Sequence, residues 1–194
     1  MWPRIPTDAC PEARADAVLA CLEAATDADY IGEDVSQLGH ALQCADLARA
    51  SGDDELVLAA LLHDLGHLVD PHAPSMEGLG TVDHEHLGAD MLRTLGFSDR
   101  VVRLVAGHVD AKRYLASRNP DYRARLSPAS ARTLELQGGP MTTAQRASFE
   151  ADPLFRDLLR VRGFDEGGKD RGDDVAPLES YRPMLVHHLR GDGS

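Results

Sequence analysis

Histidine and aspartate side chains in the middle of the chain have spacings that suit metal ligation. His63 and Asp64 are adjacent in the apolar run LAALLHDLGH, and His67 follows one helical turn after His63. His40 lies earlier, in the segment GHALQCADLARA. Burying such polar groups beside leucines costs free energy unless they are paired or coordinate a metal. We therefore interpret these four residues as candidates for a metal site.

The donor types narrow the metal chemistry. Histidine nitrogen with carboxylate oxygen suits iron, manganese, zinc or cobalt. Cys10, Cys21 and Cys44 show no CxxC spacing, which argues against structural zinc or an iron-sulfur cluster, and their odd number suits a reducing, cytoplasmic compartment. A single buried histidine is more often a core residue hydrogen-bonded to a backbone carbonyl. Several histidines at the same level of two paired helices, with an aspartate beside them, instead favour the interpretation as a metal site.

A helical hairpin would bring these residues to one level. Ser51-Gly52 is a stop signal between apolar-periodic stretches at 35–50 and 53–68. His40 lies as far before Ser51 as His63 lies after Gly52. Asp64 is about 100° further round the second helix, so it can lean toward the same seam. We expect an antiparallel pair with its polar groups between the two helices.

The rest of the chain also has helical periodicity. The aromatic share is only 5%, which indicates a core of leucine, valine and alanine and an all-α fold. A length of 194 residues suits one domain, spanning 1–194. The Thr142 and Gln145 pair has capping-box spacing, and the glycine-rich stretch 166–174 is expected to be a loop. The further expected helices are 11–26, 83–95, 98–117, 127–137, one from 142, 154–161 leading to Asp165, and 178–189.

Charge and hydropathy restrict the partners. The formal net charge of -12 disfavours binding to nucleic acid or to acidic membrane surfaces. An anionic small molecule stays possible, because a metal ion supplies strong local positive charge. No segment approaches the roughly 20 apolar residues that span a bilayer. The oligomeric state cannot be read from the sequence.

This pattern resembles the HD-domain superfamily of metal-dependent phosphohydrolases and its oxygenase branch. The resemblance implies an HD-type helical bundle, a bridging role for Asp64 between two metal ions, and a later aspartate as a further ligand. It also implies that two extra histidines complete a second ion's site. The implied ligands are His40, His63, Asp64, His84, His108 and Asp165.

The other histidines of the chain are not expected to bind metal. His84 and His86 are separated by about 200° on a helix, so only one can face inward. The residues alone leave that choice open, and the resemblance selects His84. His72, in a loop, and His187 and His188, near the end of the chain, are expected to be exposed to solvent.

A more specific likeness covers residues 30–169. The segments YIGEDVSQLGHALQCA, HEHLGAD, GHVDAKRYL, SPASARTLELQGGPM and FDEGGK closely resemble the phosphonate-degrading dioxygenases of the oxygenase branch. The resemblance implies an Fe(II)/Fe(III) pair, O2 as co-substrate, and cleavage of 2-amino-1-hydroxyethylphosphonate to glycine and phosphate. It assigns catalysis to Asp64 and His67. The implied substrate contacts are Tyr30 and Glu33 as a lid that meets an ammonium group, and His67, Lys112, Ser130 and Gln137 as a phosphonate grip.

Three functional alternatives follow. The first is the oxygenase, and the second is an HD phosphohydrolase acting on a nucleotide or phosphomonoester without oxygen. The third is a metal-stabilised binding module. Individually, Lys112 and Glu33 could be surface charges, Ser130 and Gln137 ordinary helix residues, and Tyr30 a core residue. The scarcity of aromatic residues favours a primary amine over a quaternary ammonium, which would call for an aromatic cage.

Overall fold

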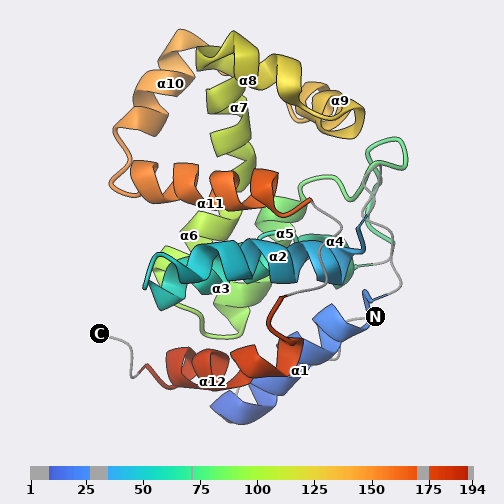
Figure 1. The fold of residues 1–194 in the computed structure, drawn as a ribbon, viewed down its shortest axis with the longest axis vertical. Coiled ribbons are helices and arrows are strands. Elements are labelled where there is room, and N and C mark those ends of the chain that lie inside the picture. The colour runs from blue at the N-terminus through green and yellow to red at the C-terminus, as the bar shows by residue number, and fades with distance from the viewer. Residues whose placement is uncertain (1–8, 27–34, 71, 170–174, 192–194) are drawn as a thin grey trace.

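The computed structural model describes residues 9–26, 35–70, 72–169 and 175–191, and it confirms the predicted all-α fold (Figure 1). Within those ranges there is no strand, and the single extended pairing is an isolated antiparallel bridge between Ser75 and Thr81. In the described part of the chain, every helix is too short or too polar to cross a bilayer. The predicted extent of one domain over residues 1–194 stays a prediction.

Several helices begin directly after a residue whose side chain caps the N-terminus of the helix. The side chains of Ser36, Asp53, Ser98, Ser127 and Thr142 each accept a hydrogen bond from a backbone N–H of the following turn, and Thr142 with Gln145 forms the predicted capping box. The helices are α1 (Pro11–Glu23), α2 (Gln37–Arg49), α3 (Asp54–Leu62), α4 (Gly66–Val69), α5 (His84–Thr94), α6 (Asp99–Ala106), α7 (His108–Arg118), α8 (Pro120–Arg125), α9 (Pro128–Leu136), α10 (Thr143–Glu150), α11 (Phe155–Gly167), the 3-10 turn η1 (Leu178–Tyr181) and α12 (Arg182–Arg190).

The expected hairpin of α2 and α3 forms the centre of the molecule. α3 packs on α2 and α6, and α11 lies across α2 and α7. Every residue from Leu56 to Leu62 is buried, so α3 is a core helix on all sides. In Figure 1, α1 and α12 form a layer on one side of this centre, and α8, α9 and α10 lie at the opposite end. The helices that carry the candidate ligands therefore meet in the middle.

The predicted continuous helix over 53–68 was wrong, because it is interrupted at residues 63–65. Backbone bonds of the tighter three-residue type, from Leu65 N–H to the Leu62 carbonyl and from His67 N–H to the Asp64 carbonyl, replace the α-helical ones. The reason is a close helix approach: a Cβ on Gly66 would lie 1.8 Å from the carbonyl oxygen of His84. The bend lets α4 pack directly on α5.

The predicted helix over 98–117 was also wrong in its continuity. It divides at Gly107 into α6 and α7, and a Cβ at Gly107 would lie 2.4 Å from the Leu158 side chain of α11. Because Gly107 has no side chain, α11 can pack against the junction between α6 and α7. His108 is then the first residue of α7. A change of direction here aims that histidine inward.

Two further expectations need correction near the end of the chain. The loop predicted from Glu166 begins later, because α11 continues to Gly167. His188 is not exposed: its Nε2 accepts the backbone N–H of Ser98 at 3.1 Å, and its ring lies 5.2 Å from that of Phe97. Packing of α12 against the α5–α6 connection buries this ring. His72 and His187 are exposed as predicted.

Candidate metal centre

The structure brings all six predicted ligands to one place, and most of them lie at helix ends. Helix ends can meet at one point more easily than helix middles, since only one turn of each must approach. The breaks at residues 63–65 and at Gly107 create two of these ends. The ligands come from α2 (His40), the turn between α3 and α4 (His63, Asp64), the starts of α5 (His84) and α7 (His108), and α11 (Asp165).

Four side chains form the first of two ligand groups, which we call site 1. His40 Nε2 lies 3.2 Å from His63 Nε2 and 3.5 Å from Asp165 Oδ1, and His63 Nε2 lies 3.3 Å from Asp64 Oδ2. Two ligand atoms about 2.1 Å from one ion lie roughly 3.0 Å apart when adjacent in an octahedral shell. These separations therefore fit atoms that share one ion.

The other oxygen of Asp64 faces the second group, which we call site 2. Asp64 Oδ1 lies 3.3 Å from His84 Nε2 and 3.5 Å from His108 Nε2, and these two nitrogens are 3.1 Å apart. One carboxylate thus presents an oxygen to each group. This is the geometry that a bridging aspartate requires, whereas a core histidine cluster would not need it.

Backbone carbonyls set the tautomers of three of the histidines. Nδ1 of His40 lies 2.7 Å from the Gly168 carbonyl oxygen, and Nδ1 of His63 and of His108 lies 2.8 Å from the carbonyls of Ala60 and Val105. A carbonyl can only accept, so each Nδ1 donates a hydrogen. In the neutral ring, Nε2 is then a lone pair directed into the site.

This arrangement fits a bound cation and is otherwise unfavourable. In neutral His40 and His63, the two Nε2 lone pairs face each other at 3.2 Å, and two acceptors cannot form a hydrogen bond. Asp165 Oδ1 is buried beside them and has no hydrogen-bond partner among the described residues. A buried polar group without a partner costs free energy. A metal ion between these atoms would satisfy all of them at once, so the residues present fit one.

The pKa values of the ligand side chains also indicate that the site favours a positive charge. Burial opposes protonation of His63, but Asp64 and Asp165 raise its pKa to about 9. Burial also opposes ionisation of Asp64, yet His63 and His84 hold its pKa well below the ordinary value. Burial, with His84 and His63 nearby, lowers the pKa of His108 well below its ordinary value, so this ring is neutral as a ligand must be.

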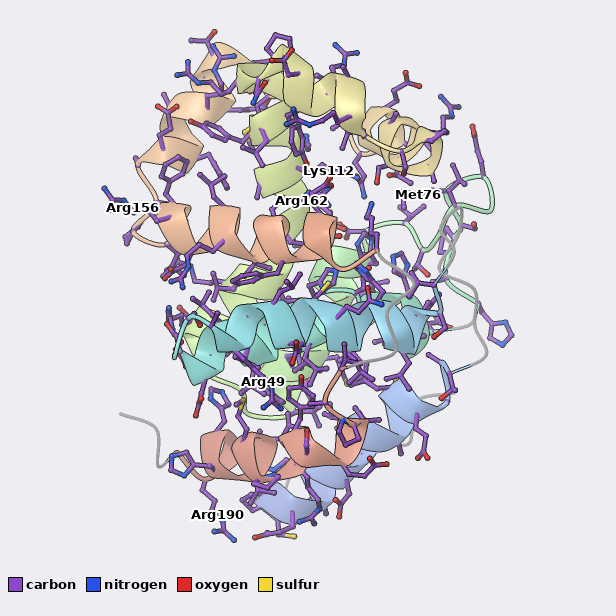
Figure 2. All side chains as sticks on the ribbon, viewed as in Figure 1. Arg49, Met76, Lys112, Arg156, Arg162 and Arg190 are labelled. Atoms are coloured by element: carbon purple, nitrogen blue, oxygen red, sulfur yellow. The ribbon has the colours of Figure 1, made fainter. Side chains whose placement is uncertain are left out.

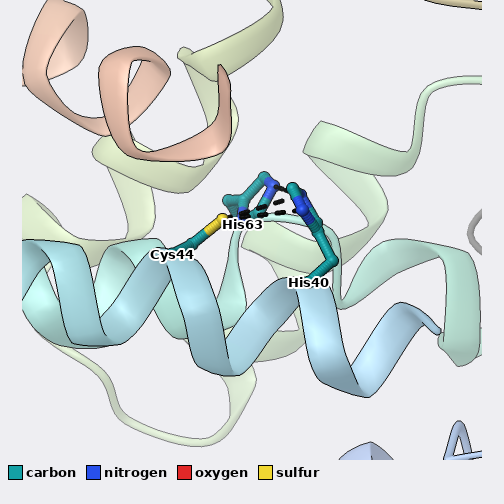
Figure 3. A group of neighbouring side chains, drawn as sticks. All are labelled: His40, Cys44 and His63. Atoms are coloured by element: carbon teal, nitrogen blue, oxygen red, sulfur yellow. Dashed lines mark hydrogen bonds between the residues drawn. The ribbon is translucent and has the colours of Figure 1, made fainter. Parts of the chain in front are cut away.

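A cysteine that was not predicted lies beside site 1. Cys44 is one turn after His40 on α2, and its Sγ lies 3.7 Å from both ring nitrogens of that histidine (Figure 3). Burial, with Asp165 and Asp64 nearby, raises the pKa of this thiol well above its ordinary value. A neutral thiol is a poor ligand. Cys44 instead packs against the backbone of Gly168, where a Cβ would lie 2.5 Å from Sγ.

Arg162 is the second residue that sequence reasoning missed. Its guanidinium bonds to Asp165 Oδ2, to Glu166, and through Nε to the Tyr122 hydroxyl at 2.8 Å. It thereby holds the outer oxygen of Asp165 and leaves Oδ1 for site 1. The i, i+3 spacing of Arg162 and Asp165 on one helix face was a usable signal.

His67 has the opposite tautomer from the ligands. Its Nδ1 accepts the backbone N–H of Thr81 at 3.0 Å, so the neutral ring carries its hydrogen on Nε2. Burial lowers the pKa of His67 to about 3, and the ring stacks on that of His84 at 4.0 Å. Gly80 makes this possible, because its φ is +110° and a Cβ there would lie 2.6 Å from the ring. His67 is thus a neutral hydrogen-bond donor.

A pocket opens on site 2. Its walls include Asp64, His84 and His108 but neither His40 nor His63, so site 1 is the deeper of the two. Met76 and Leu79 from the loop before α5 form one wall. α7, α9 and α11 contribute the others, including Val109, Lys112, Ala129, Ser130, Thr133, Gln137, Arg162 and Asp165.

Lys112 is the most unusual residue of this pocket. It is 5% exposed, and in the described chain its one hydrogen bond is from Nζ to Thr133 Oγ1 at 3.1 Å, with no carboxylate in ion-pair contact. Burial and the neighbouring Arg162 lower its pKa to about 7. Figure 2 places Lys112 and Arg162 in the same part of the molecule, where α7 meets α11.

The other predicted substrate contacts divide into two groups. Ser130 lines the pocket, and its Oγ accepts a hydrogen bond from Lys169 Nζ at 3.1 Å. Gln137 is the C-cap of α9, and its buried Oε1 has no hydrogen-bond partner in the described part of the chain. His84 points into the site, whereas His86 is exposed and bonds to Asp83 at 2.7 Å. Tyr30 and Glu33 lie outside the described residues.

Comparison with known proteins identifies the relatives of this arrangement. The HD domain family matches residues 37–156. The chain is 44% identical over 155 residues to a hydroxymethylphosphonate dioxygenase of Gimesia maris, covering 78% of this chain and 77% of that protein. It is 38% identical over 161 residues to a [1-hydroxy-2-(trimethylamino)ethyl]phosphonate dioxygenase (glycine-betaine-forming) of Leisingera caerulea, covering 82% of each. An uncharacterized protein of Acanthamoeba polyphaga mimivirus is 38% identical over 164 residues, covering 83% of this chain and 75% of the viral protein.

Proposed function

Because this chain belongs to the HD-domain family, we propose that its paired ligand groups hold two iron ions and that it is a dioxygenase that cleaves the carbon-phosphorus bond of an α-hydroxyphosphonate. Two relatives of similar length are named as phosphonate dioxygenases, which supports this activity. The two-group ligand arrangement around Asp64 supports the pair of metal ions.

The iron pair would supply binding and activation of O2, with one ion in the Fe(II) and one in the Fe(III) state. His40, His63 and Asp165 would hold the ion in site 1, His84 and His108 the ion in site 2, and Asp64 both. Because the pocket opens on site 2, the hydroxyl and phosphonate oxygens of the substrate enter on that side.

The observation that carries the proposal is Lys112, which is buried in the wall of a metal-facing pocket and has no carboxylate in ion-pair contact among the described residues. A buried cation without an anionic partner is costly, and a phosphonate would supply that partner. The Nε2–H of His67, the Ser130 hydroxyl and the Gln137 amide offer further hydrogen-bonding groups around the same space. Together they would fix which oxygens of the phosphonate turn toward the metal ions.

We propose 2-amino-1-hydroxyethylphosphonate as the substrate, with glycine and phosphate as products. Glu33, in the segment YIGEDVSQ, would meet the substrate ammonium, and Tyr30 would cover it. The two named relatives differ in this part of their substrates, since one name contains a trimethylamino group and the other contains no amine. We therefore propose that the residues near Glu33 determine amine preference.

The activity is tested with protein loaded with Fe(II) under anaerobic conditions and then mixed with substrate. Oxygen uptake, phosphate release and glycine formation are measured together across hydroxymethylphosphonate, 2-amino-1-hydroxyethylphosphonate, its trimethylated form and a panel of phosphomonoesters. We expect equimolar oxygen uptake and phosphate release from a hydroxyphosphonate. Release of phosphate from a phosphomonoester at the same rate without air would instead establish a hydrolase, and binding without turnover would leave a binding protein.

The amine assignment is tested with Glu33→Ala. We expect KM for 2-amino-1-hydroxyethylphosphonate to rise about tenfold or more, because a charge-assisted hydrogen bond of about 1.5–3 kcal/mol is lost. KM for hydroxymethylphosphonate, which has no amine, should stay within about twofold of the unmodified protein. Equal losses for both substrates would contradict a contact between Glu33 and the ammonium group.

A further inference from the structure

His84 is the one ligand histidine whose Nδ1 does not meet a backbone carbonyl. Nδ1 of His40, His63 and His108 each has a carbonyl partner at 2.7–2.8 Å. Nδ1 of His84 is buried and has no hydrogen-bond partner within the ranges that the structure describes. The ring orientation and tautomer of this ligand therefore need a different source.

The position of His84 in its helix explains the difference. His63 and His108 each use the carbonyl three residues earlier, which a preceding helical turn places beneath the ring. His84 is the first residue of α5 and follows Asp83, whose φ of +60° is left-handed. No helical turn precedes it, so the equivalent carbonyl is not available.

A buried carboxylate lies near Nδ1 of His84 instead. Glu85 is 8% exposed, and its buried Oε2 lies 3.4 Å from His84 Nδ1. No described residue forms a hydrogen bond with this oxygen. Its other oxygen lies 3.9 Å from Nδ1 of His86, which is held by Asp83. An acid in the first turn of a helix interacts well with the helix dipole even when it is fully exposed. That interaction alone does not explain why Glu85 is buried beside a ligand.

We propose that Glu85 is a positioning residue for site 2. In the metal-bound protein its carboxylate, 3.4 Å from Nδ1 in this structure, would accept the Nδ1–H of His84. The Nε2 lone pair would then face site 2, where Asp64 Oδ1 and His108 Nε2 lie 3.3 Å and 3.1 Å from Nε2. A carboxylate behind a histidine also makes the ring a stronger donor to a metal than a neutral carbonyl does. Site 2, next to the pocket, thus has a histidine whose Nδ1 lies near a carboxylate, whereas Nδ1 of both site 1 histidines meets a backbone carbonyl. This inference rests on the proposed metal centre.

The test is anaerobic Fe(II) binding to metal-free protein, with a competing chelator to resolve the two affinities. Glu85→Leu removes both the acceptor and the charge, and we expect iron affinity at site 2 to fall about 10–100-fold, as for other outer-shell partners. Glu85→Gln keeps an acceptor oxygen and should lie between Glu85→Leu and the unmodified protein. Affinity at site 1 should change less than about threefold in both.

A second measurement separates positioning from a general structural role. We expect the melting temperature of the metal-free variants to equal or exceed that of the unmodified protein, since a buried carboxylate without a hydrogen bond has been removed. Asp90→Asn, an exposed change on the same helix, is the matched control and should alter neither measurement.

The outcomes distinguish the two proposals. An unmodified protein that binds fewer than two iron ions would contradict the metal centre itself. If the unmodified protein binds two ions and Glu85→Leu binds both with unchanged affinity, Glu85 does not position His84. A parallel fall in both iron affinities and in the melting temperature of the metal-free variants would also overturn the inference, because it would indicate a structural role only.

Discussion

The two walls of the pocket are built in different ways. On the metal side, His40, His63 and His108 are fixed by bonds from Nδ1 to backbone carbonyls. On the opposite side, α9 is held at the pocket by side chains: Lys112 bonds to Thr133, and Lys169 bonds to Ser130. Arg132 of α9 also forms a bidentate ion pair with Glu77 of the loop before α5.

Because of this difference, we expect the metal side of the pocket to determine metal binding and the α9 side to determine substrate affinity. Bonds to the backbone are set by the fold, so the orientation of these three histidines changes only if the helices move. Bonds between side chains can change with single substitutions and leave the helices in place. We therefore expect substitutions on the metal side to abolish metal binding, and substitutions on the α9 side to change substrate affinity while iron stays bound.

Asp64→Asn should have the largest effect. It removes the charge that both ligand groups share, and an amide offers only one oxygen for two ions. We expect a loss of iron affinity at both sites greater than the roughly 10–100-fold cost of removing an outer-shell partner. Iron per chain and oxygen uptake measure it, with the exposed Asp46→Asn as control. Retention of two tightly bound ions would remove the bridging role from Asp64.

Lys112→Met should have the next largest effect, and it should change substrate binding without changing iron binding. The variant keeps the length of the side chain but loses the cation that would meet the phosphonate. We expect KM to rise about tenfold to a hundredfold, the equivalent of a charged hydrogen bond of about 1.5–3 kcal/mol. Iron content should not change, and exposed Arg118→Met on the same helix is the control. Loss of iron in Lys112→Met would show that the two walls are not independent.

The same variant should raise the stability of the metal-free protein. The pKa of Lys112 is lowered to about 7 from 10.5, so below pH 7 the folded state carries a buried charge that costs free energy. Between pH 7 and 10.5 the folded protein releases this proton while the unfolded chain keeps it, and the cost declines with rising pH. The gain in melting temperature for Lys112→Met should be largest at or below pH 7 and disappear toward pH 10.5. A gain that does not depend on pH would contradict this origin.

Arg132→Ala should have the smallest effect. The pair with Glu77 links α9 to the loop that carries Met76 and Leu79, but both side chains are exposed, and exposed pairs contribute about 0–1 kcal/mol. We expect KM to rise less than about fivefold, with kcat unchanged. In a Glu77→Gln background the same substitution should have no further effect, and an equal additional rise in KM would show that the pair does not hold the loop.

Much of the local structure could be predicted from the sequence. The turn signal at Ser51-Gly52 located the hairpin, and Thr142 with Gln145 located a capping box, because both act through neighbouring backbone groups. The 200° between His84 and His86 required that only one face inward, and the structure places His84 inward. The direction of a side chain along one helix depends on local geometry alone.

What only the tertiary structure decided lies where separate helices meet. The breaks at residues 63–65 and at Gly107 depend on how closely α5 and α11 approach, and the chain from 53 to 68 reads locally as one helix. The partner of His40, the Gly168 carbonyl just after α11, likewise depends on how α11 packs on α2. Residue types and helical period determined which side chains could bind metal, whereas the helix packing decided which atom of each faces the metal.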